Sequence, residues 1–158
     1  MSYTIRSAVA VDQRTIVQLI RAAHINPVGL KWPRFLVAES GGQLIGTIQV
    51  KPHLDGSREL ASLAVAPMWQ RKGIGSALIT AVLRRAVPPL YLTCGDRLEH
   101  YYARFGFRRV EPLALPHDLG RIYVAGNIVL SLASERQRLL VLRWEGNFYH
   151  NVLDTEFF

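Results

Sequence analysis

The chain has 158 residues, of which 49% are hydrophobic and 20% are charged. This length favours one domain with a substantial core, and this composition excludes an intrinsically disordered protein. The net charge is +7 and rests almost wholly on arginine, which favours an anionic ligand or partner. Cys94 is the only cysteine, so no internal disulfide can form. No apolar run is typical of a secretory signal or a membrane span, so we expect a cytoplasmic protein.

The first half of the chain alternates apolar segments with turns. The pattern predicts strands over residues 3–8, 35–38, 44–51 and 60–65. Ser40–Gln43 is a glycine-rich turn, so the second and third of these strands form a hairpin. Asp12 is a suitable N-cap for a helix. The apolar face expected for that helix consists of Ile16, Leu19, Ile20 and Ala23.

The second half predicts an α/β arrangement. A helix is expected with an apolar face made of Ile74, Ala77, Leu78, Ala81 and Val82. Further strands are expected over 90–94, 107–110 and 139–144, and further helices over 97–105 and 118–134. This order predicts a mixed, mostly antiparallel central sheet flanked by helices on both faces, with a βαβ crossover. We expect one domain over 1–145 with a helical insertion at 111–138, then a tail over 146–158 whose aromatic residues dock on the sheet or on a second subunit.

A polar loop with two glycines joins the strand over 60–65 to the helix that follows. The unpaired N–H groups at a helix start attract phosphate. Gly73 and Gly75 allow the backbone to approach such a ligand closely, and Arg71 and Lys72 add positive charge. The segment therefore predicts a phosphate-binding loop, with a plain turn that binds nothing as the alternative.

Two familiar phosphate loops fit this segment poorly. The nucleoside-triphosphate loop needs a lysine after its glycines, whereas Lys72 precedes them. The dinucleotide fingerprint needs a third small residue where Leu78 stands, and Pro67 interrupts the turn from strand to helix. Asp96 does lie near the place of a ribose-binding acid, so the dinucleotide reading is kept as an alternative.

Two motifs resemble those of the GNAT superfamily of N-acetyltransferases. The pattern Gln70-x-x-Gly73-x-Gly75 resembles its Q/R-x-x-G-x-G/A signature, and the segment YYARFGF at 101–107 resembles its F-Y-x-x-x-G-F segment. They occur in the family's order, and the resemblance covers about residues 3–144. It implies an enzyme that moves an acetyl group from acetyl-CoA directly to a primary amine, with no metal.

The resemblance also implies roles for particular residues. The backbone of Leu63, Ala64 and Val65 would hold the pantetheine arm and the thioester, where N–H groups stabilise a developing oxyanion. Tyr102 would be the general acid, because its O–H can protonate the departing thiolate. The residues that would hold the cofactor's pyrophosphate are Gln70, Arg71, Lys72, Gly73, Ile74, Gly75 and Ser76.

The general base is less clearly marked. Glu59, at the start of the strand, is the candidate, and the alternatives are Glu99, His53, His100 or no dedicated base. Many relatives carry a cofactor-contacting Asn seven residues before the tyrosine, where this chain has Gly95. That contact is therefore lost or supplied by another group. Cys94 is interpreted as a small buried side chain.

Other functions are weighed against transfer. The alternative within the fold is an acyl-CoA-binding or sensor module without efficient transfer. The positive charge invites nucleic-acid binding, but no compact basic run is present, so this is not expected as the main function. The amine acceptor stays open between a protein amine, a polyamine, an aminoglycoside and an amino acid. A homodimer is compatible with the sequence.

Overall fold

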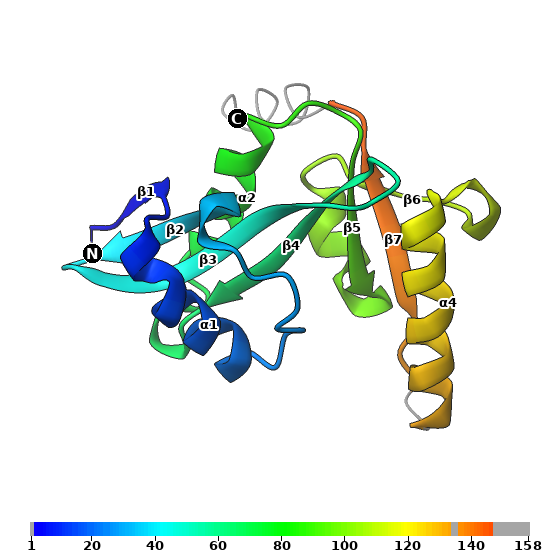
Figure 1. Ribbon diagram of the computed structural model, residues 1–158, viewed down its shortest axis with the longest axis horizontal. Helices are drawn as coiled ribbons and strands as arrows, with labels where there is room; N and C mark the ends of the chain where they lie inside the picture. The colour runs from blue at the N-terminus through cyan, green and yellow to red at the C-terminus, as the bar shows by residue number, and fades with distance from the viewer. Residues whose placement is uncertain (1, 134–135, 147–158) are drawn as a thin grey trace, which may run out of the picture. The chain divides into compact units, whose positions relative to one another are not determined.

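The computed structural model describes residues 2–133 and 136–146. These residues divide into two compact units (Figure 1). The first unit holds the residues up to Lys51 together with Leu60–Arg85, and the second holds Pro52–Glu59 and the described residues from Ala86 onward. The prediction of one domain over 1–145 stays a prediction.

Within the described residues, the strands form a mixed sheet in the order β1-β2-β3-β4-β5-β7-β6. The pairs β1/β2, β2/β3, β5/β7 and β6/β7 are antiparallel, and β4/β5 is parallel. The fold class predicted from the sequence is therefore confirmed. The strands and α-helices are β1 (Thr4–Ser7), α1 (Gln13–Ala22), β2 (Phe35–Ser40), β3 (Gln43–Pro52), β4 (Arg58–Val65), α2 (Ile74–Leu83), β5 (Leu90–Gly95), α3 (Glu99–Ala103), β6 (Arg108–Arg109), α4 (His117–Leu132) and β7 (Leu139–Trp144).

The core of the first unit lies between α1 and the β1–β3 strands. Its buried residues are Ala8, Ile16, Ile20, Phe35, Val37, Leu44 and Ala64. Helix α1 contributes Ile16 and Ile20 as expected, and Leu19 packs against the cluster. Ala23 is exposed instead, because α1 has already ended at Ala22 and Ala23 is its C-cap.

Asp12 differs from the expected helix cap. It precedes α1, but its side chain makes no capping hydrogen bond to that helix. Its carboxylate accepts hydrogen bonds from the Val9 N–H at 2.8 Å and from both terminal nitrogens of Arg6 at 2.7 and 3.2 Å. Asp12 therefore fixes the turn between β1 and α1 instead of capping α1.

Helix α2 packs tightly on β3 in the first unit. A Cβ at Gly46 would lie 3.0 Å from Leu78 Cδ1 and 3.2 Å from a methyl of Ile74, so a side chain there would push these neighbours back by a few tenths of an ångström. The buried residues of α2 are Ile74, Leu78, Ile79, Val82 and Leu83. The predicted face is right for three of them, but Ala77 and Ala81 are only partly buried.

The second unit has its own core between the sheet and α4. Strands β5 and β7 pair over their full length, from Leu90 opposite Trp144 to Gly95 opposite Leu139. Tyr91, Leu119 and Val141 form the buried cluster. Gly126 lies against this sheet, because a Cβ there would come 2.6 Å from Leu139 Cδ2.

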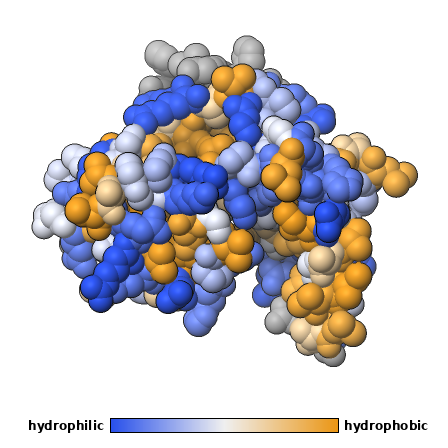
Figure 2. Space-filling model, in the orientation of Figure 1, coloured by the Kyte–Doolittle hydropathy of each residue, from blue (hydrophilic) through white to orange (hydrophobic). Residues whose placement is uncertain are grey.

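Helix α4 lies between β6 and β7, within the segment 111–138. That this segment is an insertion stays a prediction. Its outer face carries exposed apolar side chains, visible as the orange surface over α4 in Figure 2. These residues are Val124, Ile128, Val129 and Leu132. The aromatic tail residues Phe148, Tyr149, Phe157 and Phe158 lie outside the described residues.

Candidate active site

The loop between β4 and α2 has the geometry of an anion-binding turn. After the 3-10 turn Pro67–Trp69, the backbone is left-handed at Arg71 (φ 60°) and at Gly73 (φ 80°). Gly73 is the N-cap of α2, and it has no side chain with which to cap the helix. The α2 N-terminus thus presents backbone N–H groups and a partial positive charge at a place where left-handed residues favour anion binding.

This loop fits a phosphate ligand. In the described part of the chain, nothing lies within 4 Å of the position that a Cβ on Gly73 would take. Arg71 and Lys72 are exposed beside this open space, and the Lys72 ammonium lies 5.2 Å from the centre of the Trp69 ring. Open space, backbone donors and two cations suit a pyrophosphate.

Gln70, the first residue of the loop motif, has a structural task here. Its side-chain amide donates a hydrogen bond to the Val65 carbonyl at 3.0 Å. Val65 is the last residue of β4, so this bond ties the loop back to the strand that leads into it. Gln70 is one of the seven loop residues expected to bind the cofactor. Its side chain stabilises the conformation of the loop.

Strand β4 is irregular one residue before Leu63. Ser62 has a left-handed backbone (φ 57°), which is rare for a serine within a strand. Two buried β3 side chains hold it: Thr47 Oγ1 donates to the Ser62 carbonyl at 3.1 Å, and Gln49 Nε2 donates to Ser62 Oγ at 2.8 Å. Backbone strain of this kind persists only when the surroundings impose it, and it concentrates at functional sites.

Sequence reasoning missed this left-handed residue within β4. The signal available was the pair of polar residues at 47 and 49, which alternate with the apolar Ile48 and Val50. The structure shows that both polar side chains are essentially inaccessible to solvent. Buried polar side chains need partners, so their presence indicates a special backbone nearby. Leu63, Ala64 and Val65 follow Ser62 directly, and their side chains range from buried to partly buried.

Tyr102 lies on α3 in the second unit, among aromatic rings. Its ring meets Tyr101 edge-on at 5.2 Å and Phe107 at 6.2 Å between centroids. Burial, with smaller contributions from the thiol of Cys94 and the phenol of Tyr101, raises the pKa of Tyr102 well above its ordinary value. The phenol therefore stays protonated, as a proton donor must.

Glu59 is buried in the second unit and both its oxygens are engaged. His53 Nε2 lies 2.8 Å from Oε2, and Thr93 Oγ1 donates to Oε1 at 2.6 Å. Glu59 is 7% exposed, and it pairs with Tyr91 where β4 meets β5. Two of the candidate bases, Glu59 and His53, are thus brought together as one hydrogen-bonded pair that no local sequence pattern indicated.

Glu99, one of the two candidate bases on α3, is engaged in an ion pair. Glu99 forms an ion pair with Arg109, through Nε at 3.0 Å and Nη2 at 2.5 Å. These hydrogen bonds lower the pKa of Glu99, which makes it a weaker base. His100 is exposed on the same helix.

Cys94 and Gly95 end strand β5. Burial, with smaller contributions from the carboxylates of Glu99 and Asp96, raises the pKa of Cys94 to about 11, so the thiol is a poor nucleophile. At Gly95, a Cβ would come 1.9 Å from Nε2 of Gln137. The Gln137 carboxamide therefore takes the space that a side chain at position 95 would need.

The mixed sheet, the βαβ unit and the glycine-containing loop before α2 are the features of the fold class predicted from the sequence. The chain belongs to the GNAT acetyltransferase family, since the model described as the acetyltransferase (GNAT) domain matches residues 31–109. A comparison with curated proteins finds no match.

Solved structures show the same fold. N-acetylglutamate synthase from Neisseria gonorrhoeae, complexed with coenzyme A and N-acetyl-glutamate, is 21% identical with a TM-score of 0.71, covering 92% of this chain and 36% of that one. This chain thus spans about a third of that enzyme. The ribosomal-protein-S18-alanine N-acetyltransferase from Escherichia coli is 18% identical with a TM-score of 0.65, covering 91% and 94%. A GNAT acetyltransferase from Brucella melitensis in complex with acetyl-CoA is 29% identical with a TM-score of 0.55, covering 68% and 83%.

None of the helices in residues 2–133 and 136–146 combines the length and the hydropathy that a membrane crossing requires.

Proposed function

We propose that this chain is an acetyl-CoA-dependent N-acetyltransferase that passes the acetyl group directly to a primary amine. The observation that carries the proposal is the β4–α2 loop, whose left-handed residues Arg71 and Gly73 open the α2 N-terminus to a phosphate ligand. Family membership and neighbours solved with coenzyme A or acetyl-CoA support the choice of cosubstrate. The loop 70–76 would hold the pyrophosphate, with Gln70 fixing its shape.

We assign the parts of the transfer step to a few groups of the chain. The amine nitrogen attacks the thioester carbonyl, a C–N bond forms, and the C–S bond breaks. Backbone N–H groups of Leu63, Ala64 and Val65, next to the strained Ser62, would stabilise the developing oxyanion. Tyr102 would give its phenolic proton to the departing thiolate sulfur.

The proton lost by the amine needs an acceptor. We propose Glu59 as the general base, with His53 as the partner that orients its carboxylate and shares the proton. Thr93 holds the other oxygen. The buried Cys94 has no covalent role in this scheme, in keeping with its raised pKa.

The class of amine acceptor is suggested only by the similar solved structures. The printed descriptions name an amino-acid product in one relative and a protein alanine in another. A primary amine on a small molecule or on a protein is the acceptor that we propose. A homodimer and a cytoplasmic location are part of the proposal as well.

Calorimetric titration with acetyl-CoA tests the cofactor site. We expect micromolar binding by the wild type and at least a tenfold loss in the Arg71→Ala/Gly73→Ala variant. Arg84→Ala is the matched control, because it removes an exposed arginine at the opposite end of α2 and should bind normally. No binding by the wild type would overturn the proposal.

Release of free coenzyme A thiol with a panel of amines tests transfer. Tyr102→Phe keeps the ring contacts, so we expect binding within twofold of wild type and a kcat lower by about 10²-fold or more. Tyr101→Phe is the matched control and should retain its kcat. Binding without transfer to any amine would point to the sensor alternative.

A further inference from the structure

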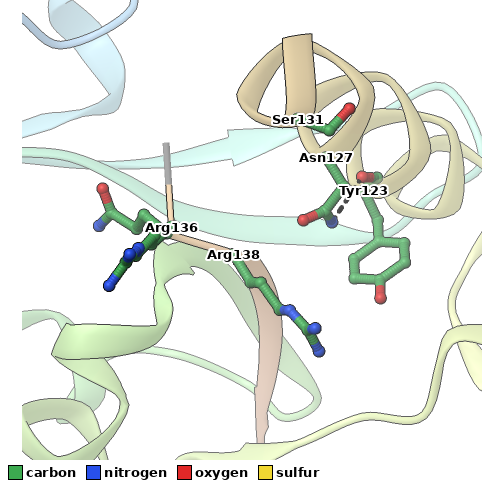
Figure 3. Close-up of a pocket in the computed structure, with 6 residues that line it drawn as sticks. Tyr123, Asn127, Ser131, Arg136 and Arg138 are labelled. Atoms are coloured by element: carbon green, nitrogen blue, oxygen red, sulfur yellow. Dashed lines mark hydrogen bonds between the residues drawn. The ribbon is translucent and has the colours of Figure 1, made fainter. Parts of the chain in front are cut away.

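A pocket of about 570 Å³ opens in the second unit beside α4 (Figure 3). One wall comes from α4 and the other from the segment that leads into β7. Its lining residues are Tyr123, Asn127, Ser131, Arg136, Gln137 and Arg138. We call it the α4–β7 pocket.

The wall next to β7 is fixed by hydrogen bonds on two sides. Asn127 on α4 donates to the Leu139 carbonyl at 3.1 Å and accepts from the Leu139 N–H at 3.0 Å, which copies the pairing of a neighbouring strand. On the other side, the Asp96 N–H donates to the Arg138 carbonyl at 2.8 Å. Arg138 therefore projects from a backbone that is held in place, as a binding residue requires.

Among the described residues that line the pocket, two are arginines and none carries a carboxylate. Arg136 and Arg138 are both exposed, and neither has an ion pair with any residue that the structure describes. In Figure 3 the side chains of Arg138 and Tyr123 extend to the same side of the pocket. A guanidinium fork and a phenolic O–H on one side form a donor set for a carboxylate.

The pocket lies at the end of β5 that adjoins the proposed acid. The Gln137 carboxamide lies against Gly95 at the end of β5, and the Cys94 thiol, one residue earlier, is among the groups near enough to Tyr102 to raise the pKa of its phenol. A ligand anchored by Arg138 is thus held beside the strand end that neighbours Tyr102. The phosphates of the cosubstrate have their own proposed site in the loop 70–76.

We propose that the α4–β7 pocket binds a carboxylate of the acceptor through Arg138, with Tyr123 as a second donor. The acceptor is then a compound that carries both a primary amine and a carboxylate, such as an amino acid. This inference rests on the proposed transferase function and deepens it by naming the substrate class. Arg136, which also lines the pocket, adds positive charge without a direct contact being required.

Matched acceptors test the inference. The panel is a set of L-amino acids, β-alanine and 4-aminobutyrate, each paired with its own carboxamide. Conversion to the amide lowers the pKa of an α-amine, so more of the amine is in its neutral, nucleophilic form at neutral pH. A preference for the acid therefore cannot come from the reactivity of the amine. We expect kcat/KM at least tenfold higher for one or more of the acids than for the paired amide.

The variant Arg138→Gln should remove that preference. We expect its kcat/KM for the preferred acid to fall at least tenfold, chiefly through KM, while its rate with the amide and its affinity for acetyl-CoA stay within twofold. Arg121→Gln is the matched control, since Arg121 is an exposed arginine on α4 that does not line the pocket. It should behave as wild type.

Several results would overturn the inference. Transfer to neutral amines with no preference for acids would refute the carboxylate site while leaving the transferase function standing. Loss of acetyl-CoA affinity in Arg138→Gln, but unchanged affinity for the 3′-dephospho cofactor, would assign the pocket to a cofactor phosphate instead. Absence of both acetyl-CoA binding and transfer in the wild type would refute the proposed function itself.

Discussion

Tyr102 and Glu59 meet different requirements at the scale of single residues. Tyr102 is surrounded by rings and by a buried thiol, an environment that disfavours the phenolate. Glu59 is buried with its two oxygens hydrogen-bonded to His53 and Thr93, which compensates the cost of burying this polar group. In the proposed transfer, Tyr102 would be the acid that keeps its proton and Glu59 the carboxyl group held in one orientation.

The raised pKa of Tyr102 leads to a prediction for the pH profile. A general acid acts in its protonated form, so a higher pKa extends activity toward alkaline pH. We expect kcat to show no descending limb between pH 7 and pH 10, where an ordinary tyrosine, with a pKa of about 10, would already be half ionised. Steady-state rates at saturating acetyl-CoA measure this.

Tyr102→Phe provides the comparison for that profile. Its residual rate should have the same dependence on pH below 10, because the group removed does not titrate in that range. A wild-type limb with an apparent pKa below 10 that disappears in Tyr102→Phe would contradict the assignment.

At the scale of elements, the strands and helices with a clear hydrophobic pattern could be predicted from the sequence. The sequence pattern placed the last strand at 139–144, and β7 is Leu139–Trp144. The hairpin of β2 and β3 and the parallel β4–α2–β5 unit were also predicted correctly. These elements carry strong hydrophobic patterns and clear turn residues, so local physics decides them.

Other elements depended on tertiary context. Helix α2 buries Ile79 and Leu83 as well as the predicted stripe, because an apolar helix covered on more than one side has no single buried face. The strand expected over 107–110 is reduced to Arg108–Arg109. Two groups of contacts join segments that are distant in the chain, so no local sequence pattern could predict them. They are the hydrogen bonds of Glu59 to His53 and Thr93, and the contact between Gln137 and Gly95.

The connection between α4 and β7 leads to a prediction about stability. Asn127 makes two hydrogen bonds to the Leu139 backbone and one to the Tyr123 carbonyl at 2.9 Å. We expect Asn127→Ala to lower the free energy of unfolding by about 1–3 kcal/mol, because backbone groups at a buried junction lose their partner. Urea unfolding measures the change.

Ser131→Ala is the control for this prediction. Ser131 also lines the pocket, but it is exposed, and within residues 2–133 and 136–146 its hydroxyl donates only to the Ile128 carbonyl of its own helix. Its removal should change stability by less than about 0.5 kcal/mol. Equal effects of the two substitutions would show that Asn127 does not hold β7.

At the scale of the whole molecule, the +7 charge is unevenly neutralised. Arg6, Arg109 and Arg143 form ion pairs with nearby carboxylates. Arg71 in the loop and Arg138 in the pocket have no ion pair within the part of the chain that the structure describes. Arg71 and Arg138, which lie at the two proposed anion sites, are thus among the arginines whose charge no described carboxylate neutralises.

The Arg6–Asp12 pair leads to a prediction about acid stability. Hydrogen bonds from Arg6, together with the Val9 N–H, lower the pKa of the buried Asp12 below its ordinary value of 3.8. A carboxyl group with a lower pKa in the folded chain stabilises it fully above the unfolded pKa. That contribution is lost as the pH falls from about 3.8 through the lower folded value.

Asp12→Asn should therefore lower the free energy of unfolding by about 2 kcal/mol at pH 7, and by clearly less at pH 3. Glu111→Gln removes one negative charge from an exposed position, so it corrects for the altered net charge and should change stability little at either pH. Denaturant titrations of the three proteins at both pH values give the differences. A gap between wild type and Asp12→Asn that is equally large at pH 3 would mean that the folded protein gains its stability from the shape of this side chain, with no contribution from its charge.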